Sequence, residues 1–453
     1  MARQQYDVVT NAQALNRAFR WVFGGAGWVE IPFRSNAKWT PQTLAAVACL
    51  IPCNDRENIT DAFEESRDMA RSWDMGSVAE SFQGFFKRLI QHGQALLAIV
   101  VQALRMRMRE LMTRMRVEED DLLFAVDGSR LELARTKNLQ KRFCGKGPKS
   151  KRKGKKKTKS QQKKADSPQA WLTVLYSLNL GMPWDFRCGP SGSSEREHFL
   201  EMLSSLPAKA VITADAGFVG YDFWSALLQA NTAFVIRVGA NVKLLKRLGA
   251  TRFSGEIVSL WPDQQRKKQA PPLTLRLVRL QGVREQVYLV TNVLDEEQLS
   301  EERIITIYHK RWRIELYYRA FKQTFGKRKM RCASADNVEQ ELTWSVVSLW
   351  MMTLYAASQR FEAGETLDSL SPAGVIKAFR EAIRQWPTTP AVAKSLDVLI
   401  RAASKDAYVR TSKKTNKEYP RKKKKKKLGA PTIKPATPEQ IQQAREVAFI
   451  TSA

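Results

Sequence analysis

The chain has 453 residues, of which 43% are hydrophobic, so it holds enough apolar side chains for two or three folded domains and is not globally disordered. Its formal net charge of +30 favours a phosphate-bearing partner. The N-terminal sequence MARQQYDVVT lacks a signal-peptide core and no apolar run is long enough to span a bilayer, which together predict a soluble protein of the cytoplasm with no membrane contact.

The cysteines indicate a reducing compartment, because they are odd in number and scattered along the chain. They are Cys49, Cys53, Cys144, Cys188 and Cys332. The chain has only three histidines, so no set of zinc ligands is expected at the usual spacing.

Residues 1–118 are predicted to be helical. Thr40 precedes Pro41 as an N-cap followed by proline at the first helical position. Asn58 or Thr60 is expected to begin a second helix, and Ser77 a longer one whose apolar residues recur at helical spacing. We interpret this segment as a helical DNA-binding domain, with a helical packing or dimerisation domain as the alternative.

Residues 119–360 are predicted to form an α/β domain, because strand patterns alternate there with helical ones. Two short apolar strands, Leu122–Val126 and Ala210–Ala214, are each expected to end at an aspartate, Asp127 and Asp215. Further strands are expected at Trp171–Leu180, 184–188, 232–239 and 285–292, a helix at 221–230 and a β-rich insert at about 240–285. Residues 361–453 are expected to be helical, with a loose basic tail after Asp406.

Two runs of basic residues stand out. Residues 146–164 hold eleven Lys or Arg and no acid, and residues 421–427 hold seven more. Such a composition cannot bury enough apolar surface to order itself, so the first run is predicted to be a disordered loop. Nonspecific attraction to DNA is the favoured interpretation, and a merely solvated run or a nuclear address is the alternative.

A basic helix is predicted from Tyr308 to Lys322, which contains neither Gly nor Pro and follows the helix-start signal Ser300-Glu301-Glu302. Its polar residues recur three or four positions apart, which places them on one face. They are Tyr308, Arg311, Glu315, Arg319 and Lys322. Trp312, Leu316 and Phe321 lie on other faces and are expected to be buried. The alternative is a solvated basic helix with an incidental glutamate.

Asp127, Asp215 and Glu315 are candidate metal ligands. Three carboxylates on separate elements suit a site for two Mg²⁺ ions, because Mg²⁺ prefers oxygen ligands and two such ions support in-line phosphoryl transfer. An aspartate after a strand is also an ordinary turn former, so each aspartate alone is weak evidence.

Three stretches resemble the signature regions of the DDE transposases of bacterial insertion sequences, in the family named after insertion sequence four. They are DGSR at Asp127, TADAGFVGYDFW around Asp215 and YHKRWRIELYYRAFK around Glu315. The family signature, Tyr, two residues, Arg, three residues, Glu, six residues, Lys, is matched at every position. The resemblance covers about residues 120–357 and implies a ribonuclease-H-like catalytic core with a β-rich insert before the last carboxylate.

The resemblance implies that Asp127, Asp215 and Glu315 hold two Mg²⁺ ions, for which Mn²⁺ substitutes. Arg311 and Lys322 would bind DNA phosphates. Tyr308 would hydrogen-bond a phosphate at the transposon end, and Arg319 would face the same backbone. These roles agree with the fork geometry of arginine and the point charge of lysine.

The function implied is cut-and-paste transposition by a prokaryotic, nucleoid-associated homodimer, acting on double-stranded DNA at the transposon ends and the target. A structure-selective nuclease or resolvase on the same fold is the main alternative, followed by a catalytically silent DNA-binding protein. Some relatives capture a flipped base with a tryptophan of the insert. Here the equivalent strand contains Tyr288, so Tyr288 or Trp261 is the candidate for that role.

Overall fold

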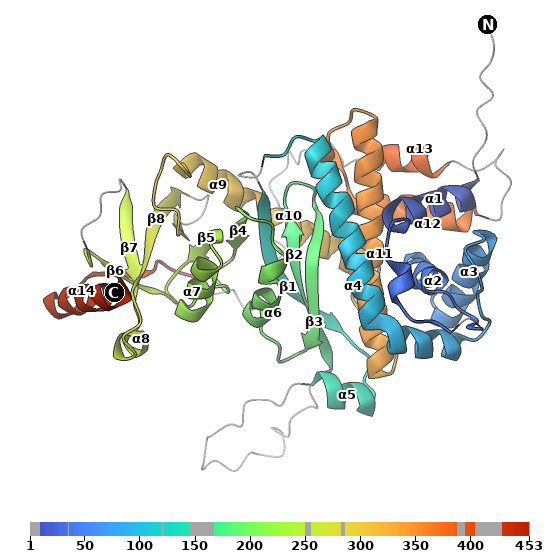
Figure 1. The fold of residues 1–453 in the computed structure, drawn as a ribbon, viewed down its shortest axis with the longest axis horizontal. Coiled ribbons are helices and arrows are strands. Elements are labelled where there is room, and N and C mark those ends of the chain that lie inside the picture. The colour runs from blue at the N-terminus through green and yellow to red at the C-terminus, as the bar shows by residue number, and fades with distance from the viewer. Residues whose placement is uncertain are drawn as a thin grey trace, which may run out of the picture. The chain divides into compact units, whose positions relative to one another are not determined.

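The computed structural model describes residues 10–452 except 35, 119–121, 145–166, 250–254, 282–285, 387–394 and 404–427. The chain forms two compact units, each assembled from separate segments (Figure 1). Unit 1 comprises Met1–Val117, Gly128–Ser194 and Ile314–Lys405, and unit 2 comprises Glu118–Asp127, Glu195–Arg313 and Asp406–Ala453. Both basic runs lie outside the described residues. The division into three domains predicted above stays a prediction.

Unit 1 is mainly helical and is built around α11 (Ala335–Glu362), which is buried over most of its length and contacts α1, α2, α4 and α12. Figure 1 shows α4 lying alongside α11. The other helices are α1 (Asn11–Phe23), η1 (Trp28–Glu30), α2 (Pro41–Cys53), α3 (Ile59–Ser72), α4 (Phe82–Arg114), α5 (Lys137–Phe143), α10 (Trp312–Arg319, whose first two residues belong to unit 2), η5 (Ala320–Thr324), η6 (Leu367–Ser369), α12 (Pro372–Arg384) and α13 (Leu396–Arg401).

The predicted starts of α2 and α3 are confirmed. The Thr40 hydroxyl accepts a hydrogen bond from the Thr43 backbone N–H at 3.1 Å, and Asn58, rather than Thr60, caps α3. The expected start of α4 after Ser77 was wrong, because Ser81 caps that helix. The Ser77 carbonyl instead accepts a hydrogen bond from the Thr43 hydroxyl at 2.9 Å, which holds the chain outside α4.

A β-hairpin completes unit 1. Strands β2 (Gln169–Ser177) and β3 (Met182–Pro190) pair antiparallel, as the two apolar runs predicted. Helix α4 is fixed to β3 by Arg105, which donates to the Trp184 carbonyl at 2.9 Å and forms an ion pair with Asp185 at 2.5 Å. Asp185 is nearly buried and also pairs with Arg187, so this buried carboxylate has the compensating charges that it requires.

Unit 2 is a mixed sheet flanked by helices. Its strands follow the order β10-β6-β7-β8-β9-β5-β4-β1. Strands β1, β4 and β5 pair in parallel, whereas from β5 through β9 and β8 to β7 each strand is antiparallel to the one before it. The strands are β1 (Leu123–Glu132, which continues into unit 1), β4 (Val211–Ala214), β5 (Ala233–Val238), β6 (Lys243–Lys246), β7 (Glu256–Leu260), β8 (Leu273–Gln281), β9 (Gln286–Thr291) and β10 (Thr432–Pro435). The helices are α6 (Glu195–Met202), η4 (Leu203–Ser205), α7 (Tyr221–Gln229), α8 (Asp263–Lys267), α9 (Glu301–Lys310) and α14 (Pro438–Ser452).

The range 240–285 contains the strands β6, β7 and β8, with the short helix α8 between β7 and β8, as its β-like pattern predicted. That this range is an insert in a ribonuclease-H-like core stays a prediction. The chain is thus a mixed α/β protein with a large sheet and many helices. In the part of the chain that the structure describes, no helix is long and apolar enough to cross a membrane. All five cysteines are described, and none forms a disulfide.

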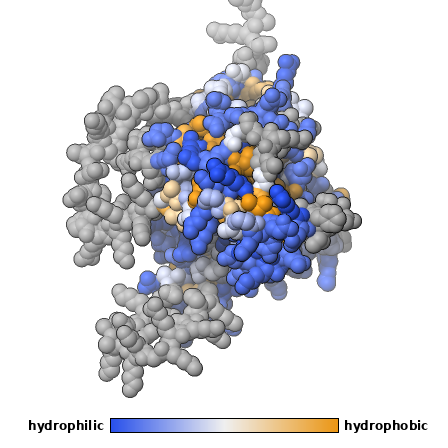
Figure 2. Space-filling model, turned by 90° about the vertical axis from the view of Figure 1, so that its left-hand side faces the viewer, coloured by the Kyte–Doolittle hydropathy of each residue, from blue (hydrophilic) through white to orange (hydrophobic). Residues whose placement is uncertain are grey.

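The C-terminal segment differs from the prediction. Residues after Asp406 were expected to be loose, but β10 pairs with β6 in parallel and α14 packs Val447 against Leu248 and Trp261. These apolar contacts explain why β10 and α14 are ordered. The basic composition of the run before them had led to the opposite expectation. The end of unit 2 that carries β6, β7 and α14 is mostly hydrophilic, with small apolar areas among the charged ones (Figure 2).

Candidate active site

Asp127 lies on β1, and Asp215 directly follows the neighbouring parallel strand β4. The register of β1 and β4 pairs Leu123 with Val211 and Ala125 with Thr213, two residues before each aspartate. The residues before each aspartate are buried, whereas the two aspartates are half-buried. Two carboxylates therefore reach a partly open position from the buried core of unit 2.

Asp215 was correctly predicted to follow the end of its strand, since β4 ends at Ala214. The same expectation for Asp127 was wrong, because β1 continues to Glu132. The continuation has a physical reason in unit 1. The Glu132 N–H donates to the Arg328 carbonyl at 2.9 Å, and the Met330 N–H donates to the Glu132 carbonyl at 3.2 Å. The sequence DGSR is therefore strand rather than turn.

The turn after β4 holds Asp215 rigidly. The Gly217 N–H donates to Asp215 Oδ1 at 2.8 Å, and a Cβ atom at Gly217 would lie only 2.9 Å from that oxygen. Asn241 donates to the Ala216 carbonyl at 3.0 Å. Gly220, with φ of +149°, then leads into α7. A carboxylate fixed in this way is suited to a hard cation such as Mg²⁺.

The predicted helix from Tyr308 to Lys322 is present but is not continuous. Helix α9 ends at Lys310, α10 begins at Trp312, and the π-helical turn η5 follows from Ala320. At the first junction the Arg311 N–H donates to the Tyr308 carbonyl at 3.2 Å, which is a tighter, 3₁₀-type bond. Residue spacing alone does not distinguish these helix types, because their periods are similar.

The five signature residues fall into two groups. Tyr308 and Arg311 belong to unit 2, where the Arg311 guanidinium lies over the Tyr308 ring at 5.5 Å. Glu315, Arg319 and Lys322 belong to unit 1. Glu315 and Lys322 are half-buried and Arg319 is exposed, so all three are accessible from solvent.

Helix α10 is anchored on its apolar side. Ile314, Tyr317 and Phe321 are buried at helical spacing, and the Tyr318 hydroxyl donates to the Leu172 carbonyl of β2 at 3.1 Å. The burial of Phe321 was predicted, but that of Trp312 was not confirmed, because its side chain is 53% exposed. The apolar stripe that starts at Ile314 fills the buried face and leaves Trp312 outside it.

The two candidates for base capture, Trp261 and Tyr288, differ in burial. Trp261 is buried, and its indole N–H donates to the Ala270 carbonyl at 2.7 Å, so it serves the core of unit 2. Tyr288 is half-buried on β9. Its hydroxyl donates to the Gln286 side chain at 2.8 Å.

Two of the three predicted metal ligands belong to adjacent parts of one unit, Asp127 on β1 and Asp215 directly after β4. Among the described residues, no three His, Cys, Asp or Glu side chains gather closely enough to hold a metal ion. Asp127 and Asp215 share unit 2, whereas Glu315 belongs to unit 1. The two aspartates remain candidate oxygen donors for a divalent cation, and Glu315 is the candidate for completing the set.

A buried charge network, which the sequence analysis missed, follows the signature helix in unit 1. Glu341 of α11 pairs with Lys327 at 3.6 Å and with Arg331 at 3.5 Å. It also accepts hydrogen bonds from the backbone N–H groups of Arg331 and Cys332, both at 2.9 Å. The signal in the sequence was a glutamate just before the apolar stretch of α11. A buried acid requires partners, so such a glutamate indicates basic residues nearby in the fold.

The network should make stability depend on pH. Burial lowers the pKa of Lys327 from 10.5 to about 8, although Glu341 opposes the change. Between these two values the unfolded chain holds a proton that the folded chain has lost, so the free energy of unfolding should rise with pH through this window. Urea titrations at several pH values would show a smaller rise for Lys327→Met than for wild type, and equal slopes would contradict this assignment.

Comparison with known proteins shows the family. The model of the family described as "Transposase DDE domain" matches residues 118–351. The transposase InsG for insertion sequence element IS4 of Escherichia coli strain K12 is 24% identical over 198 residues, which cover 42% of this chain and 44% of that protein. The alignment thus spans less than half of the relative's length.

A solved structure, the piggyBac transposase synaptic complex with hairpin DNA, aligns over 92% of this chain and 90% of that chain, with a TM-score of 0.38 and 11% identity. A likeness at this level supports no argument about the present chain. The family match, by contrast, spans slightly more than half of the residues and includes Asp127, Asp215 and the complete Tyr-Arg-Glu-Lys signature. The chain belongs to the DDE transposase family.

Proposed function

We propose that the protein catalyses cut-and-paste transposition of an insertion sequence, by cleaving the 3′ ends at terminal inverted repeats and transferring them into target DNA. The observation that carries this proposal is that Asp127 lies on β1 and Asp215 directly after the parallel neighbouring strand β4, in a chain that also holds the complete signature around Glu315. The ribonuclease-H-like core is part of the proposal, and the position of the β-rich insert between β5 and α9 supports it.

DDE transposases generally depend on divalent metals, and we assign Asp127, Asp215 and Glu315 as ligands of two Mg²⁺ ions, with Mn²⁺ as a substitute. Bound metal would activate the attacking oxygen and stabilise the leaving one. The carboxylate donors and the rigid turn at Asp215 fit hard cations of this kind.

The cationic residues of the signature are assigned to the DNA backbone. Arg311 can offer two parallel N–H groups to a phosphate, and Lys322 a single mobile charge. Tyr308, in contact with Arg311, would donate its hydroxyl to a phosphate at the transposon end, and the exposed Arg319 would face the same strand. Holding two transposon ends at once requires two active sites, so we propose a homodimer on double-stranded DNA, associated with the nucleoid.

The test is cleavage in Mg²⁺ of a DNA fragment that carries the gene with its own flanks, with the products mapped to the nucleotide. Wild type should cut at matching inverted repeats and join the ends to target DNA, whereas Asp215→Asn should not. Asp222→Asn is the matched control, because Asp222 lies in the same segment on α7 and contacts Gln265 rather than the site. Cuts without joined products would indicate a nuclease, and binding without cuts a DNA-binding protein.

A further inference from the structure

The signature helix ends in an unusual turn. Residues Ala320–Thr324 form a π-helix, in which the Phe325 N–H donates to the Ala320 carbonyl at 2.8 Å. The chain then leaves the helix at Gly326, whose φ is +73°. The carbonyl groups of Thr324 and Phe325 therefore lie at a helix end, where they need partners from outside the helix.

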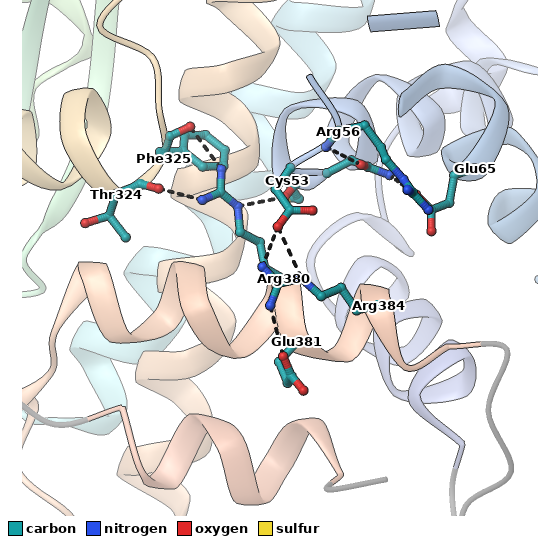
Figure 3. A network of polar contacts seen from close by, with 10 residues as sticks. Cys53, Arg56, Glu65, Thr324, Phe325, Arg380, Glu381 and Arg384 are labelled. Carbon is teal, nitrogen blue, oxygen red and sulfur yellow. Dashed lines mark hydrogen bonds and ion pairs between the residues drawn. The ribbon is translucent and has the colours of Figure 1, made fainter. Parts of the chain in front are cut away.

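Arg380 of α12 supplies those partners. Its guanidinium donates to the Thr324 carbonyl at 2.6 Å and to the Phe325 carbonyl at 3.1 Å, and it lies over the Phe325 ring at 5.7 Å. Its Nε donates to the carbonyl of Cys53, the last residue of α2, at 3.1 Å. Figure 3 shows the guanidinium between these three carbonyl groups. One side chain of α12 thus joins two helix ends within unit 1, those of η5 and α2.

The position of Lys322 depends on this turn. Lys322 lies inside η5, and a π turn contains one residue more than an α turn. If the turn relaxed to an α-helix, the rotation per residue inside it would change. Because Lys322 lies inside the turn, the direction of its ammonium group relative to Glu315, which precedes the turn on α10, would change as well.

We infer that Arg380 is a positioning residue, which holds the π turn and thereby fixes Lys322 relative to Glu315 for the proposed reaction. The inference rests on the proposed function for its consequence in catalysis. Lysine at position 380 would keep the charge but could not donate to three carbonyl groups in the planar arrangement of a guanidinium. Geometry, rather than charge, is therefore the property on which this role depends.

Substitution of Arg380 should loosen the turn without unfolding the unit. A cavity of about 670 Å³ adjoins this position, lined by Thr324, Lys377, Arg380 and Arg384 among others. Water can enter this space and solvate the carbonyl groups that Arg380→Ala would release. Arg384→Ala is the matched control, because Arg384 pairs with Asp55 and Glu381 one turn further along α12 and does not contact the signature helix.

The first measurement is amide hydrogen exchange of the free protein. Arg380→Ala should accelerate exchange at residues 320–327, while Arg384→Ala should leave these amides at the wild-type rate. Arg380→Lys should resemble Arg380→Ala. Unchanged exchange at 320–327 in Arg380→Ala would overturn the inference. This measurement does not depend on any activity of the protein.

The second measurement is a double-mutant cycle on the rate of DNA-end cleavage. A misplacement of about 1 Å can cost about 10²-fold in rate, so Arg380→Ala should be slower by about 10- to 100-fold. In the Lys322→Ala background the same substitution should have almost no further effect, because a residue that acts through Lys322 is not additive with its loss. An effect of equal size in both backgrounds would show a general structural role instead.

The two measurements also separate this inference from the proposed function. If wild type cleaves and Arg380→Ala cleaves equally fast, the inference alone fails. If wild type does not cleave DNA ends, the proposed function fails and the catalytic consequence of Arg380 fails with it, while hydrogen exchange still decides whether Arg380 holds the turn.

Discussion

Glu315→Gln should lower the rate of DNA-end cleavage by about 10³-fold or more, because a metal ligand supports several kcal/mol of charge stabilisation and 1.36 kcal/mol corresponds to a factor of ten. The amide keeps the size of the side chain but lacks the negative charge that a divalent cation needs. Glu315 is half-buried on α10, and the helix is held by Tyr318 and its apolar face, so folding should not change.

The expected loss is confined to catalysis. Affinity for transposon-end DNA, measured by gel shift in Ca²⁺, should remain near that of wild type, because phosphate contacts are assigned to Arg311, Arg319 and Lys322. Glu302→Gln is the control, since Glu302 is an exposed acid in the first turn of α9. Loss of both binding and cleavage in Glu315→Gln would show that Glu315 is structural, and retained cleavage would remove it from the active site.

Glu341→Gln should destabilise unit 1 by about 3–5 kcal/mol, because removal of one member of a buried ion pair leaves the other charge uncompensated. Glu341 has 1% side-chain exposure, and its partner Lys327 has 5%. Two backbone N–H groups donate to one oxygen of the glutamate, Oε2, which the amide oxygen can replace. The amide NH₂ would instead replace Oε1, which pairs with Lys327 and Arg331. Urea unfolding followed by circular dichroism would measure the change.

A nearby acid provides the comparison for this experiment. Glu339 lies two residues earlier on α11, is 37% exposed and pairs with Arg142 at 3.0 Å. Exposed pairs of this kind contribute about 0–1 kcal/mol, so Glu339→Gln should change little. A similarly small effect for Glu341→Gln would mean that the buried charges are solvated or paired differently from the arrangement seen in the structure.

The elements that carry the candidate residues could be predicted from the sequence because their signals are local. Apolar runs that end at Asp127 and Asp215 identified two strands, and fixed spacing identified the Tyr-Arg-Glu-Lys helix. The sequence did not show that β1 continues beyond Asp127, because the partners of that extension are backbone groups near Arg328. Nor did it show that Trp312 is exposed, since the apolar stripe of α10 could start at either Trp312 or Ile314.

Long-range contacts account for the remaining differences between the predicted and the observed structure. Arg380 and Cys53 are 327 residues apart in the sequence, and no local pattern relates them. The basic run at 421–427 masked the order of the segment after it, where Val447 packs on Trp261. The π turn at Lys322 was likewise hidden, because its stabilising arginine lies in α12. These features depend on tertiary partners rather than on residue periodicity.

The most direct test of the proposed metal site is to locate a bound metal on the chain. Fe²⁺ in place of Mg²⁺, with ascorbate and peroxide, generates radicals that cut the backbone beside the metal. With transposon-end DNA present, we expect cuts near Asp127, Asp215 and Glu315, all lost in Asp215→Asn. Cuts near the two aspartates without any near Glu315, or cuts that persist in Asp215→Asn, would contradict a single metal site formed by the three carboxylates.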